Sequence, residues 1–581
     1  MLHIEQALTG KWPNLANNPA YPLIIKLLKK LLHEKEINDF IEQNQHLRGF
    51  AFLDQVLAHF DFSYQVNSQQ LQRIPAEGKV IIVANHPIGS LDGLALLKLV
   101  RSVRADVRIV ANDLLSNIEP LQDLFLPVDN MASNQHKAAF KAMLNALEGE
   151  QAVIIFPAGE VSRIRPNGVK DGAWKSGFLK LAQRSQAPVL PIQIDARNSS
   201  LFYALSTLYK PLGSLFLVQE MFNKTAQKIE FHIGKPISAE TLQKAVEESS
   251  VKVVAKQFRK YLYRLAKPKR LNKKPFLPTI ETIAHPIDRK ALKQAIHQGQ
   301  LLGETNDRKK IYLFDFDANS PVMQEIGRLR ELTFRSVQEG TGKSSDLDHY
   351  DALYQHLVLW DESEWEIVGA YRLGQGTHPQ QDRLKTDAEI YSASLFDFKP
   401  SIHAELQNCL ELGRSFVQPK YWGKRSLDYL WFGIGAYLKQ HPNIQYMFGP
   451  VSLSNAYPQN AKELIAAFYL QQFGDYQSLV QARQPFAISE ESLAIAKQEF
   501  SGDYSASLKK LNALLALEGV KLPTLFKQYA ELCDDKGCRF IDFNIDPLFA
   551  DCIDAFIFVD ISKVKDKKRQ RYMGEAKISV A

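Results

Sequence analysis

The chain has 581 residues, with 71 Lys and Arg against 64 Asp and Glu, and therefore a net charge of +7. Hydrophobic residues make up 45% and charged residues 23%, a composition typical of folded proteins that excludes a largely disordered or collagen-like chain. At about 150 residues per domain, the length predicts roughly two to four domains.

The first segment, residues 1–75, reads as helical. Between Tyr21 and Glu34, basic side chains recur at the spacing of one helix face among leucines and isoleucines: Lys26, Lys29, Lys30 and His33. Such a helix can lie in an anionic bilayer interface, or it can pack on its own domain. The chain start lacks a secretory signal pattern, and no window approaches ~18–20 uninterrupted apolar residues. We therefore expect a cytoplasmic protein, peripheral on the inner face of the cytoplasmic membrane.

From residue 76 to residue 266, short β-rich runs alternate with helical segments. The expected strands are Val80–Ala84, Val107–Ala111, Ala152–Pro157, Pro188–Ile194 and Ile229–Ile233. The expected helices are Leu91–Val103, Gln135–Glu148, Trp174–Ser185 and one long helix over Ala239–Leu265. This alternation predicts an α/β domain, a sheet covered by helices.

The first candidate site follows the strand KVIIVAN, which runs directly into HPIGSLDG and a helix. Asn85, His86 and Asp92 surround this strand-to-helix turn, a position where reacting groups often lie. A histidine oriented by a carboxylate can act as a general base on a substrate hydroxyl, so that no serine or cysteine nucleophile is needed. A capping aspartate beside an incidental histidine is the alternative.

A second turn strengthens this prediction. In AVIIFPAGEVSR, a strand ends in a glycine turn at Gly159, and the charged residues Glu160 and Arg163 follow this turn. With LFLPVDN and APVLPIQI, the chain holds four ordered blocks that resemble the glycerolipid acyltransferases, whose signature is NHx4D, a middle basic block, FPEGTR and VPVxP. The resemblance implies acyl transfer to a hydroxyl, with His86 and Asp92 catalytic and Asn85, Gly159, Glu160 and Arg163 binding substrate.

Three departures from that signature narrow the range of acceptor substrates that we expect. Five residues, not four, separate His86 from Asp92, and Gly89 is suited to absorb the extra one. Ala158 replaces the glutamate of FPEG, and Asp129–Asn130 stand where the middle block has a basic residue. Arginines are the side chains best suited to bind a phosphate monoester. Because the basic residue of the middle block is missing here, we expect an acceptor other than lysophosphatidate. The variants resemble the haemolysin-like subgroup, which includes acyltransferases of amino-acid-containing lipids.

The next segment, residues 267–300, is a basic and proline-containing linker. Eight basic residues and no acidic one lie between Arg259 and Lys274. Residues 1–300 hold 39 Lys and Arg against 26 Asp and Glu, whereas residues 301–581 hold 32 against 38. The basic half suits an anionic membrane or an acidic carrier protein, and the acidic half suits a cationic small molecule. No module that reads nucleic acid accompanies the charge.

A second α/β series is expected over residues 301–581. Its expected strands begin near Ile311 and continue at Trp365–Leu373, Leu410–Val417, Tyr446–Ser452, Arg539–Asn544 and Ala555–Ile561. Its first expected helices are Val322–Ser336 and Ser426–Gln440. The cysteines Cys533, Cys538 and Cys552 lack the spacing of zinc knuckles, so we expect no metal site.

The second candidate site lies in ELGRSFVQPKYWGKRSLDYLWFGIGAYL. A loop with Gly423, Lys424 and Arg425 before a helix start predicts an anion cradle for a phosphopantetheine arm. ELGRxxV, WxGIGxYL and FGPVSxS resemble the GNAT branch that acylates the α-amine of ornithine with a 3-hydroxyacyl chain. Glu411 is the candidate to orient Arg414 or to accept the amine proton; a Glu–Arg pair that only braces its strand is the alternative.

Together the halves resemble the bifunctional ornithine lipid synthases. The resemblance implies acyl carrier protein thioesters as donors and no bound cofactor. It also implies ornithine as first acceptor and lyso-ornithine lipid as second, with lysine, glutamine or glycine open in place of ornithine. One alternative function is a glycerophospholipid acyltransferase with an accessory C-terminal half. A non-enzymatic, haemolysin-like membrane-lysing protein is the other.

Overall fold

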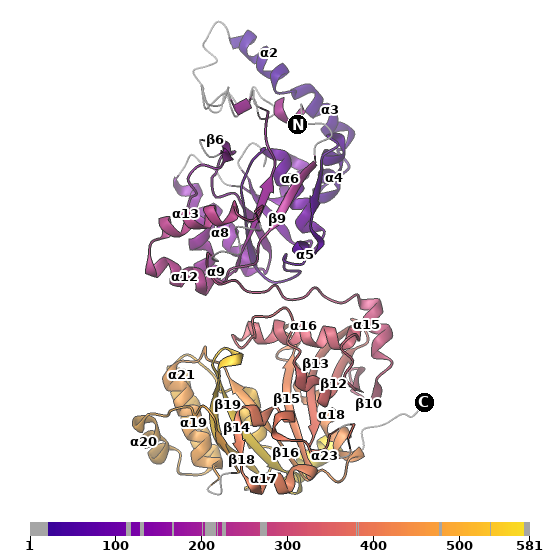
Figure 1. Ribbon diagram of the computed structural model, residues 1–581, viewed down its shortest axis with the longest axis vertical. Coiled ribbons are helices and arrows are strands. Elements are labelled where there is room, and N and C mark those ends of the chain that lie inside the picture. The colour runs from indigo at the N-terminus through magenta and orange to yellow at the C-terminus, as the bar shows by residue number, and fades with distance from the viewer. Residues whose placement is uncertain are drawn as a thin grey trace. The chain divides into compact units, whose positions relative to one another are not determined.

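The computed structural model describes residues 21–111, 118–127, 133–165, 168–199, 202–203, 217, 219–222, 228–267, 276–378, 380–381, 383–475, 479–534 and 536–574 (Figure 1). Residues 1–20, Asp129 and Asn130 of the predicted middle block, and residues 268–275 of the basic linker lie outside this set. The chain divides into two compact units, Met1–His285 and Pro286–Ala581, each with its own sheet and core. Both units are α/β, which confirms the predicted fold class.

The first unit is built on a seven-stranded sheet of order β1-β9-β8-β2-β5-β3-β4. Its strands are β1 (Ser63–Val66), β2 (Val80–Ala84), β3 (Val107–Ala111), β4 (Phe125–Pro127), β5 (Ala152–Ile155), β8 (Val189–Asp195) and β9 (Lys228–Ile233). Neighbouring strands are parallel except β8 and β9. β2 lies near the middle and is buried throughout, so its carboxyl end opens at the centre of the sheet edge.

Helices cover both faces of this sheet. Ile82 of β2 packs in the core with α4 (Gly49–His59) and α6 (Ser90–Arg101), whereas Ile81 and Val83 face the other layer. That layer consists of α8 (Ser133–Glu148), α9 (Gly177–Ser185), α12 (Ala239–Glu248) and α13 (Val251–Leu262). The alternation follows from the period of two along a strand and explains the continuous apolar run of β2.

Two expectations for this unit are wrong. Residues 1–75 are not all helical, because β1 pairs in parallel with β9 before the short helix α5 (Ser68–Leu71). The long helix expected over Ala239–Leu265 divides into α12 and α13, since the Ser250 side chain caps α13 by accepting from the Val253 N–H. Hydrophobic periodicity reveals neither the pairing of β1 with β9 nor the serine cap that separates α12 from α13.

The N-terminal amphipathic stretch forms α2 (Tyr21–Leu31) and α3 (Glu34–Gln43), with His33 in a left-handed conformation between them. On α2, Ile25 is buried, whereas Leu23 and Leu27 are 74% and 67% exposed. Among the described residues, no helix is long and apolar enough to cross a bilayer.

The second unit has an eight-stranded sheet of order β10-β11-β12-β13-β15-β16-β19-β18. The strands are β10 (Gln300–Glu304), β11 (Lys309–Phe314), β12 (Gln355–Asp361), β13 (Glu366–Gln375), β15 (Cys409–Val417), β16 (Tyr446–Leu453), β18 (Cys538–Asp546) and β19 (Cys552–Asp560). All neighbouring strands are antiparallel except β15 and β16. These two are parallel, and only Cys409–Glu411 of β15 pairs with Tyr446–Phe448 of β16. Past these residues the two central strands stop pairing with one another.

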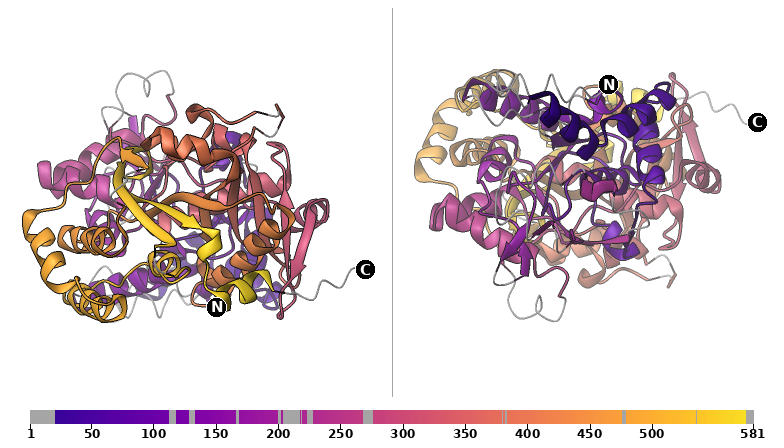
Figure 2. Two further views of the ribbon diagram at one scale, coloured as in Figure 1. Left: turned by 90° about the horizontal axis from the view of Figure 1, so that it is seen from below. Right: turned by 90° about the horizontal axis from the view of Figure 1, so that it is seen from above.

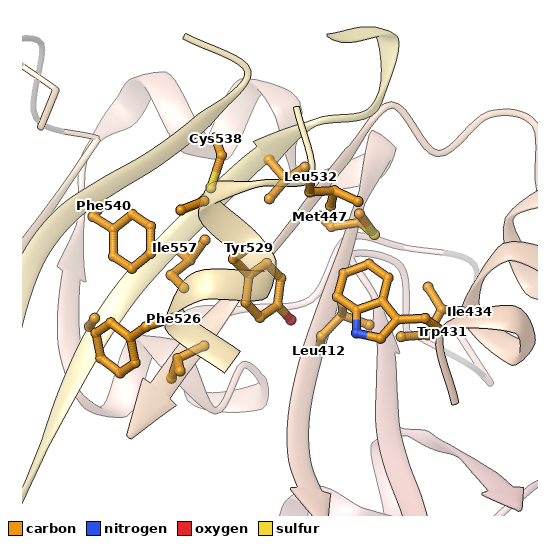
Figure 3. Close-up of a cluster of buried hydrophobic side chains, with 14 of the residues drawn as sticks. Leu412, Trp431, Ile434, Met447, Phe526, Tyr529, Leu532, Cys538, Phe540 and Ile557 are labelled. Carbon is orange, nitrogen blue, oxygen red and sulfur yellow. The ribbon is translucent and has the colours of Figure 1, made fainter. Parts of the chain in front are cut away.

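One face of this sheet carries a large apolar core. Helices α18 (Ser426–Gln440), α19 (Gln459–Phe473), α21 (Tyr504–Leu517) and α22 (Thr524–Ala530) pack there, and α20 (Glu490–Glu499) packs on α19. α19 and α22 pack on β18, whereas α18 packs on β10 to β13. Figure 2 shows the orange helices that follow α18 in the chain to one side of the yellow strands β18 and β19. Figure 3 shows Leu412, Met447 and Ile557 of the sheet meeting Trp431 and Tyr529 of the helices.

The opposite face holds two separate apolar clusters. One lies under α15 (Arg289–Ile296) and α16 (Pro321–Ser336). The other includes Tyr354, Tyr391 and the small sheet of β14 (Phe396–Phe398) and β17 (Val480–Ala482), next to α17 (Pro400–Glu405). Buried charged residues are concentrated on this face, and α23 (Asp566–Met573) closes the described chain.

Candidate active sites

The end of β2 brings His86 and Asp92 together. His86 follows the strand directly, and Asp92 lies in the first turn of α6. Nδ1 of His86 lies 3.1 Å from Oδ1 of Asp92, which is fully buried, while the His86 side chain remains 19% exposed. The ring stacks on Phe156 at a centroid distance of 4.2 Å. The predicted pair is therefore in contact, and its ring is accessible from one side.

The additional residue of the motif is absorbed in the turn. Gly89 adopts φ 118° and ψ −126°, a conformation that favours glycine. The Asp92 carboxylate accepts the Ile88 N–H at Oδ2 and the Gly93 N–H at Oδ1, both at 2.8 Å. The same side chain thus fixes the loop and faces the imidazole, so its position is set before any substrate arrives.

Both polar atoms of the Asn85 side chain bond to the backbone of β8. Its Nδ2 donates to the carbonyl of Ile194, and its Oδ1 accepts the Ile194 N–H. Both polar ends thus tie the end of β2 to β8, and a role of Asn85 in binding substrate stays a prediction.

A second carboxylate supports the His86 loop, and sequence reasoning did not find it. Asp171 is fully buried after the hairpin β6 (Arg163–Arg165) and β7 (Gly168–Lys170). It accepts Ser162 Oγ at 2.5 Å and Trp174 Nε1 at 2.8 Å, and the His86 N–H lies 3.3 Å from its Oδ1. The Ser162 N–H in turn donates to the His86 carbonyl at 2.7 Å.

These charges act on the imidazole. Burial acts to lower the pKa of His86, but the negative charges of Asp92 and Asp171 outweigh it, so the pKa is raised above its usual value. For Asp171, burial raises the pKa of the carboxyl and outweighs the hydrogen bonds from Ser162 and Trp174, which act to lower it. An imidazole made more basic in this way is suited to accept a proton from a hydroxyl.

The glycine turn after β5 lies in the same unit. Gly159 adopts φ 65°, and a Cβ built there would lie 3.4 Å from Nζ of Lys175. Glu160 and Arg163 approach to 3.5 Å. The predicted residues thus form a partly exposed charged group to which Lys175 adds a cation, and their binding of substrate stays a prediction.

In the second unit, Glu411 and Arg414 lie on β15 but have different partners. Glu411 accepts from Ser392 N at 2.7 Å, from Ser392 Oγ at 2.6 Å and from the Tyr354 hydroxyl. Arg414 instead lies 3.2 Å from both Asp346 and Asp348. The hypothesis that Glu411 orients Arg414 is not supported by these contacts, because each group is held by other residues.

Arg414 is in a strained position. It has φ 48° within a bulge of β15, where the register to β13 shifts. Its guanidinium lies over the rings of Tyr391 and Phe549 at 4.5 and 4.8 Å. The bulge turns this cation toward the face that holds the buried acids.

The predicted anion cradle precedes α18. Gly423 has φ 73° with open space at its Cβ position, and Lys424 and Arg425 are exposed. Lys424 Nζ lies 4.9 Å from the Tyr421 ring centroid. The loop therefore offers two exposed cations at a helix start, and its use by a phosphopantetheine arm stays a prediction.

Comparison with known proteins identifies the type of enzyme. The Acyltransferase family model matches residues 6–267, and the Acetyltransferase (GNAT) domain model matches residues 329–432. A glycine N(alpha)-acyltransferase of Bacteroides thetaiotaomicron is 32% identical over 51% of this chain and 90% of its own length. A lyso-glycine lipid O-acyltransferase of the same organism is 34% identical over 38% of this chain and 83% of its own length. The chain belongs to the acyltransferases.

A further relative matches the second half of this acyltransferase. An L-ornithine N(alpha)-acyltransferase of Rhizobium meliloti is 28% identical over 43% of this chain and 77% of its own length. Both predicted resemblances are thus confirmed, with the acyltransferase domain first and the GNAT domain second. The chain is an enzyme with O- and N-acyltransferase domains, which excludes the non-enzymatic alternative. Enzymes of these families take the acyl group from a thioester donor.

Proposed function

We propose that this acyltransferase makes an amino-acid lipid in two steps. Residues 301–581 N-acylate the amino acid with a 3-hydroxyacyl group, and residues 76–266 then esterify the free 3-hydroxyl of that lyso-lipid. The observation that carries the second step is the contact of His86 with Asp92 at the end of β2. The order follows from chemistry, since the hydroxyl that is esterified belongs to the product of the first step.

His86 is the proposed base of the O-acylation. Its free ring nitrogen takes the proton of the hydroxyl as the oxygen attacks the thioester carbonyl, the C–S bond breaks, and the thiolate leaves and is protonated to the thiol. Asp92 holds the ring and stabilises the imidazolium, as the raised pKa of His86 indicates. Asp171 adds to this by fixing the backbone of the loop.

Ornithine is the proposed amino acid, and glycine is a second candidate. Residues 301–581 carry a net negative charge, and Glu339, Asp546 and Asp554 are buried close to Arg414, so an acceptor with two amines fits the charge. Glycine is the second candidate because the glycine enzymes match this chain with higher identity and coverage than the ornithine enzyme does.

The proposed donor is an acyl thioester of acyl carrier protein, and the proposed location is the inner face of the cytoplasmic membrane. The basic first half would attract an acidic carrier and anionic lipid. Leu23 and Leu27 on α2 are exposed beside Lys26 and Lys30, which suits insertion between anionic headgroups.

The proposal is tested by purifying the full chain and supplying 3-hydroxyacyl and acyl thioesters of acyl carrier protein with ornithine or glycine. Mass spectrometry should detect the amide first and the ester of that amide later, with one amino acid preferred. Lysophosphatidate serves as the competing acceptor. Acylation of lysophosphatidate without any amide would establish a glycerophospholipid acyltransferase and contradict the proposal.

A further inference from the structure

A buried glutamate lies near the point where β15 and β16 stop pairing. Glu339 follows α16 and is 6% exposed. Its Oε2 accepts the hydroxyl of Ser452 at 3.0 Å, and Ser452 lies on β16, four residues beyond the last pair with β15. The Ser454 hydroxyl donates to the Val337 carbonyl at 2.6 Å and anchors the segment that carries Glu339. One bond from β16 and one from Ser454, which follows that strand directly, thus hold this carboxylate where β15 and β16 no longer pair.

A second carboxyl lies on the same face of the sheet. Asp554 of β19 is directly opposite Ser452 in the antiparallel register, and opposite residues point to the same side. Asp554 is 5% exposed, and none of the described residues donates a hydrogen bond to its carboxyl. Because a buried carboxyl without a donor is unfavourable, this side chain points to a bound group that supplies N–H donors.

The charges around Glu339 and Asp554 favour the binding of a cation. Asp546 of β18 is occupied by the Tyr391 hydroxyl at 3.2 Å and the Leu548 N–H at 2.9 Å. Arg414 of β15 is already paired with Asp346 and Asp348. The other titratable groups that act on these two carboxyls are neutral, because burial raises the pKa of each: Cys552 of β19, Tyr391, and Tyr457, which follows β16.

The proton affinity of the two groups agrees with this environment. Burial raises the pKa of Glu339 to about 7, although the Ser452 hydroxyl acts to lower it. Burial, with the neighbouring Asp546 and Glu339, raises the pKa of Asp554 well above its usual value. A carboxyl with a pKa near the working pH can both take up and release a proton in each cycle.

We propose that Glu339 and Asp554 form the amine-acceptor site of the N-acyltransferase unit, with Ser452 orienting Glu339. The inference rests on the proposed N-acylation of an amino acid. The α-ammonium gives one proton to Glu339, and the free amine attacks the thioester carbonyl. The amide forms as the C–S bond breaks, the second amine proton passes to the leaving thiolate, and Glu339 releases its proton to water. Asp554 accepts an N–H of the same amine.

This site replaces Glu411 as the proton acceptor. Among the described residues, Ser392 and Tyr354 donate three hydrogen bonds to Glu411, so most of its acceptor capacity is used inside the protein. Glu339 accepts one hydrogen bond, from Ser452, and therefore keeps an oxygen for the amine.

The test is the pH dependence of amide formation by the full chain, measured as amide by mass spectrometry with saturating 3-hydroxyacyl carrier protein. Wild type should rise to a plateau with an inflection near pH 7. Glu339→Gln should lower the rate by about 100-fold or more and remove that inflection. Ser452→Ala should move the inflection to higher pH, because it removes a bond that lowers the pKa. Asp554→Asn should raise KM for the amino acid more than it lowers kcat.

Glu491→Gln, on the exposed side of α20, is the matched control, and hydrogen exchange of peptides from the second unit reports that each variant is folded. A Glu339→Gln enzyme that keeps its rate within threefold, or keeps the inflection, overturns the inference while amide formation by wild type upholds the proposed function. Absence of amide in wild type with every amino acid overturns both.

Discussion

The support of the catalytic loop by Asp171 makes a quantitative prediction. In Asp171→Asn, one carboxylate oxygen becomes an NH2 group. If the remaining oxygen keeps Ser162 and the His86 N–H, the new NH2 faces the Trp174 Nε1–H, which the carboxylate accepts at 2.8 Å. Two buried donors then oppose one another, which costs about 1–3 kcal/mol.

Hydrogen-exchange mass spectrometry of peptides over residues 80–95 and 160–175 measures this cost locally, which suits a chain of two units. Asp171→Asn should lower the local opening free energy by about 1–3 kcal/mol, with Asp195→Asn on the exposed end of β8 as control. Trp174→Phe removes the opposed indole donor, so the double variant should recover part of the loss, with a coupling of about 1 kcal/mol or more.

The same variant tests the electrostatics. Because the negative charge of Asp171 helps to raise the pKa of His86, its removal should move the inflection of the O-acylation rate to lower pH. Strictly additive opening free energies together with an unchanged inflection would refute the role of Asp171.

Three further predictions follow from individual contacts. Gly89→Ala places a side chain at φ 118°, which should cost about 1–3 kcal/mol, and should reduce O-acylation while N-acylation is kept; equal loss of both activities would contradict a local effect. In Tyr354→Phe, Glu411 keeps its bonds from Ser392 but Oε2 loses the tyrosine hydroxyl, and the Tyr391 N–H loses its acceptor. The free energy of unfolding of the second unit should fall by about 2–4 kcal/mol, and N-acylation should fall more than O-acylation. Leu23→Asp with Leu27→Asp should weaken binding to anionic vesicles by about 100-fold or more without unfolding the chain, since both side chains are exposed; sedimentation that matches wild type would exclude α2 as the membrane contact.

Much of the sheet architecture follows from apolar runs bounded by turns. β2, β3 and α18 agree with their expected bounds, because each combines a clear period with a clear stop. The strands expected from the sequence do not include β12, although its run LVLW is apolar; a histidine precedes this run and an aspartate follows it. The break between α12 and α13 depends on one serine cap, a signal that the amphipathic period conceals.

Some contacts of the two sites can likewise be predicted from a short motif, and others cannot. His86 and Asp92 lie six residues apart, so a motif is sufficient to pair them. Asp171 reaches the same loop from 85 residues away, and Asp348 reaches Arg414 from 66 residues away. Sequence order carries no signal for such contacts, because sheet topology and the bulge of β15 create them. Glu411 was therefore the natural candidate by motif, whereas packing places Ser392 and Tyr354 on it.

The central claim is that His86 serves the ester-forming step alone. The most direct measurement supplies purified full-length enzyme with the N-(3-hydroxyacyl) amino acid and an acyl thioester and follows the doubly acylated product. We predict that His86→Ala abolishes that product while amide formation from the free amino acid continues, and that His46→Ala, an exposed histidine of the same unit, changes neither rate. Formation of the doubly acylated lipid by His86→Ala at the wild-type rate would contradict the account.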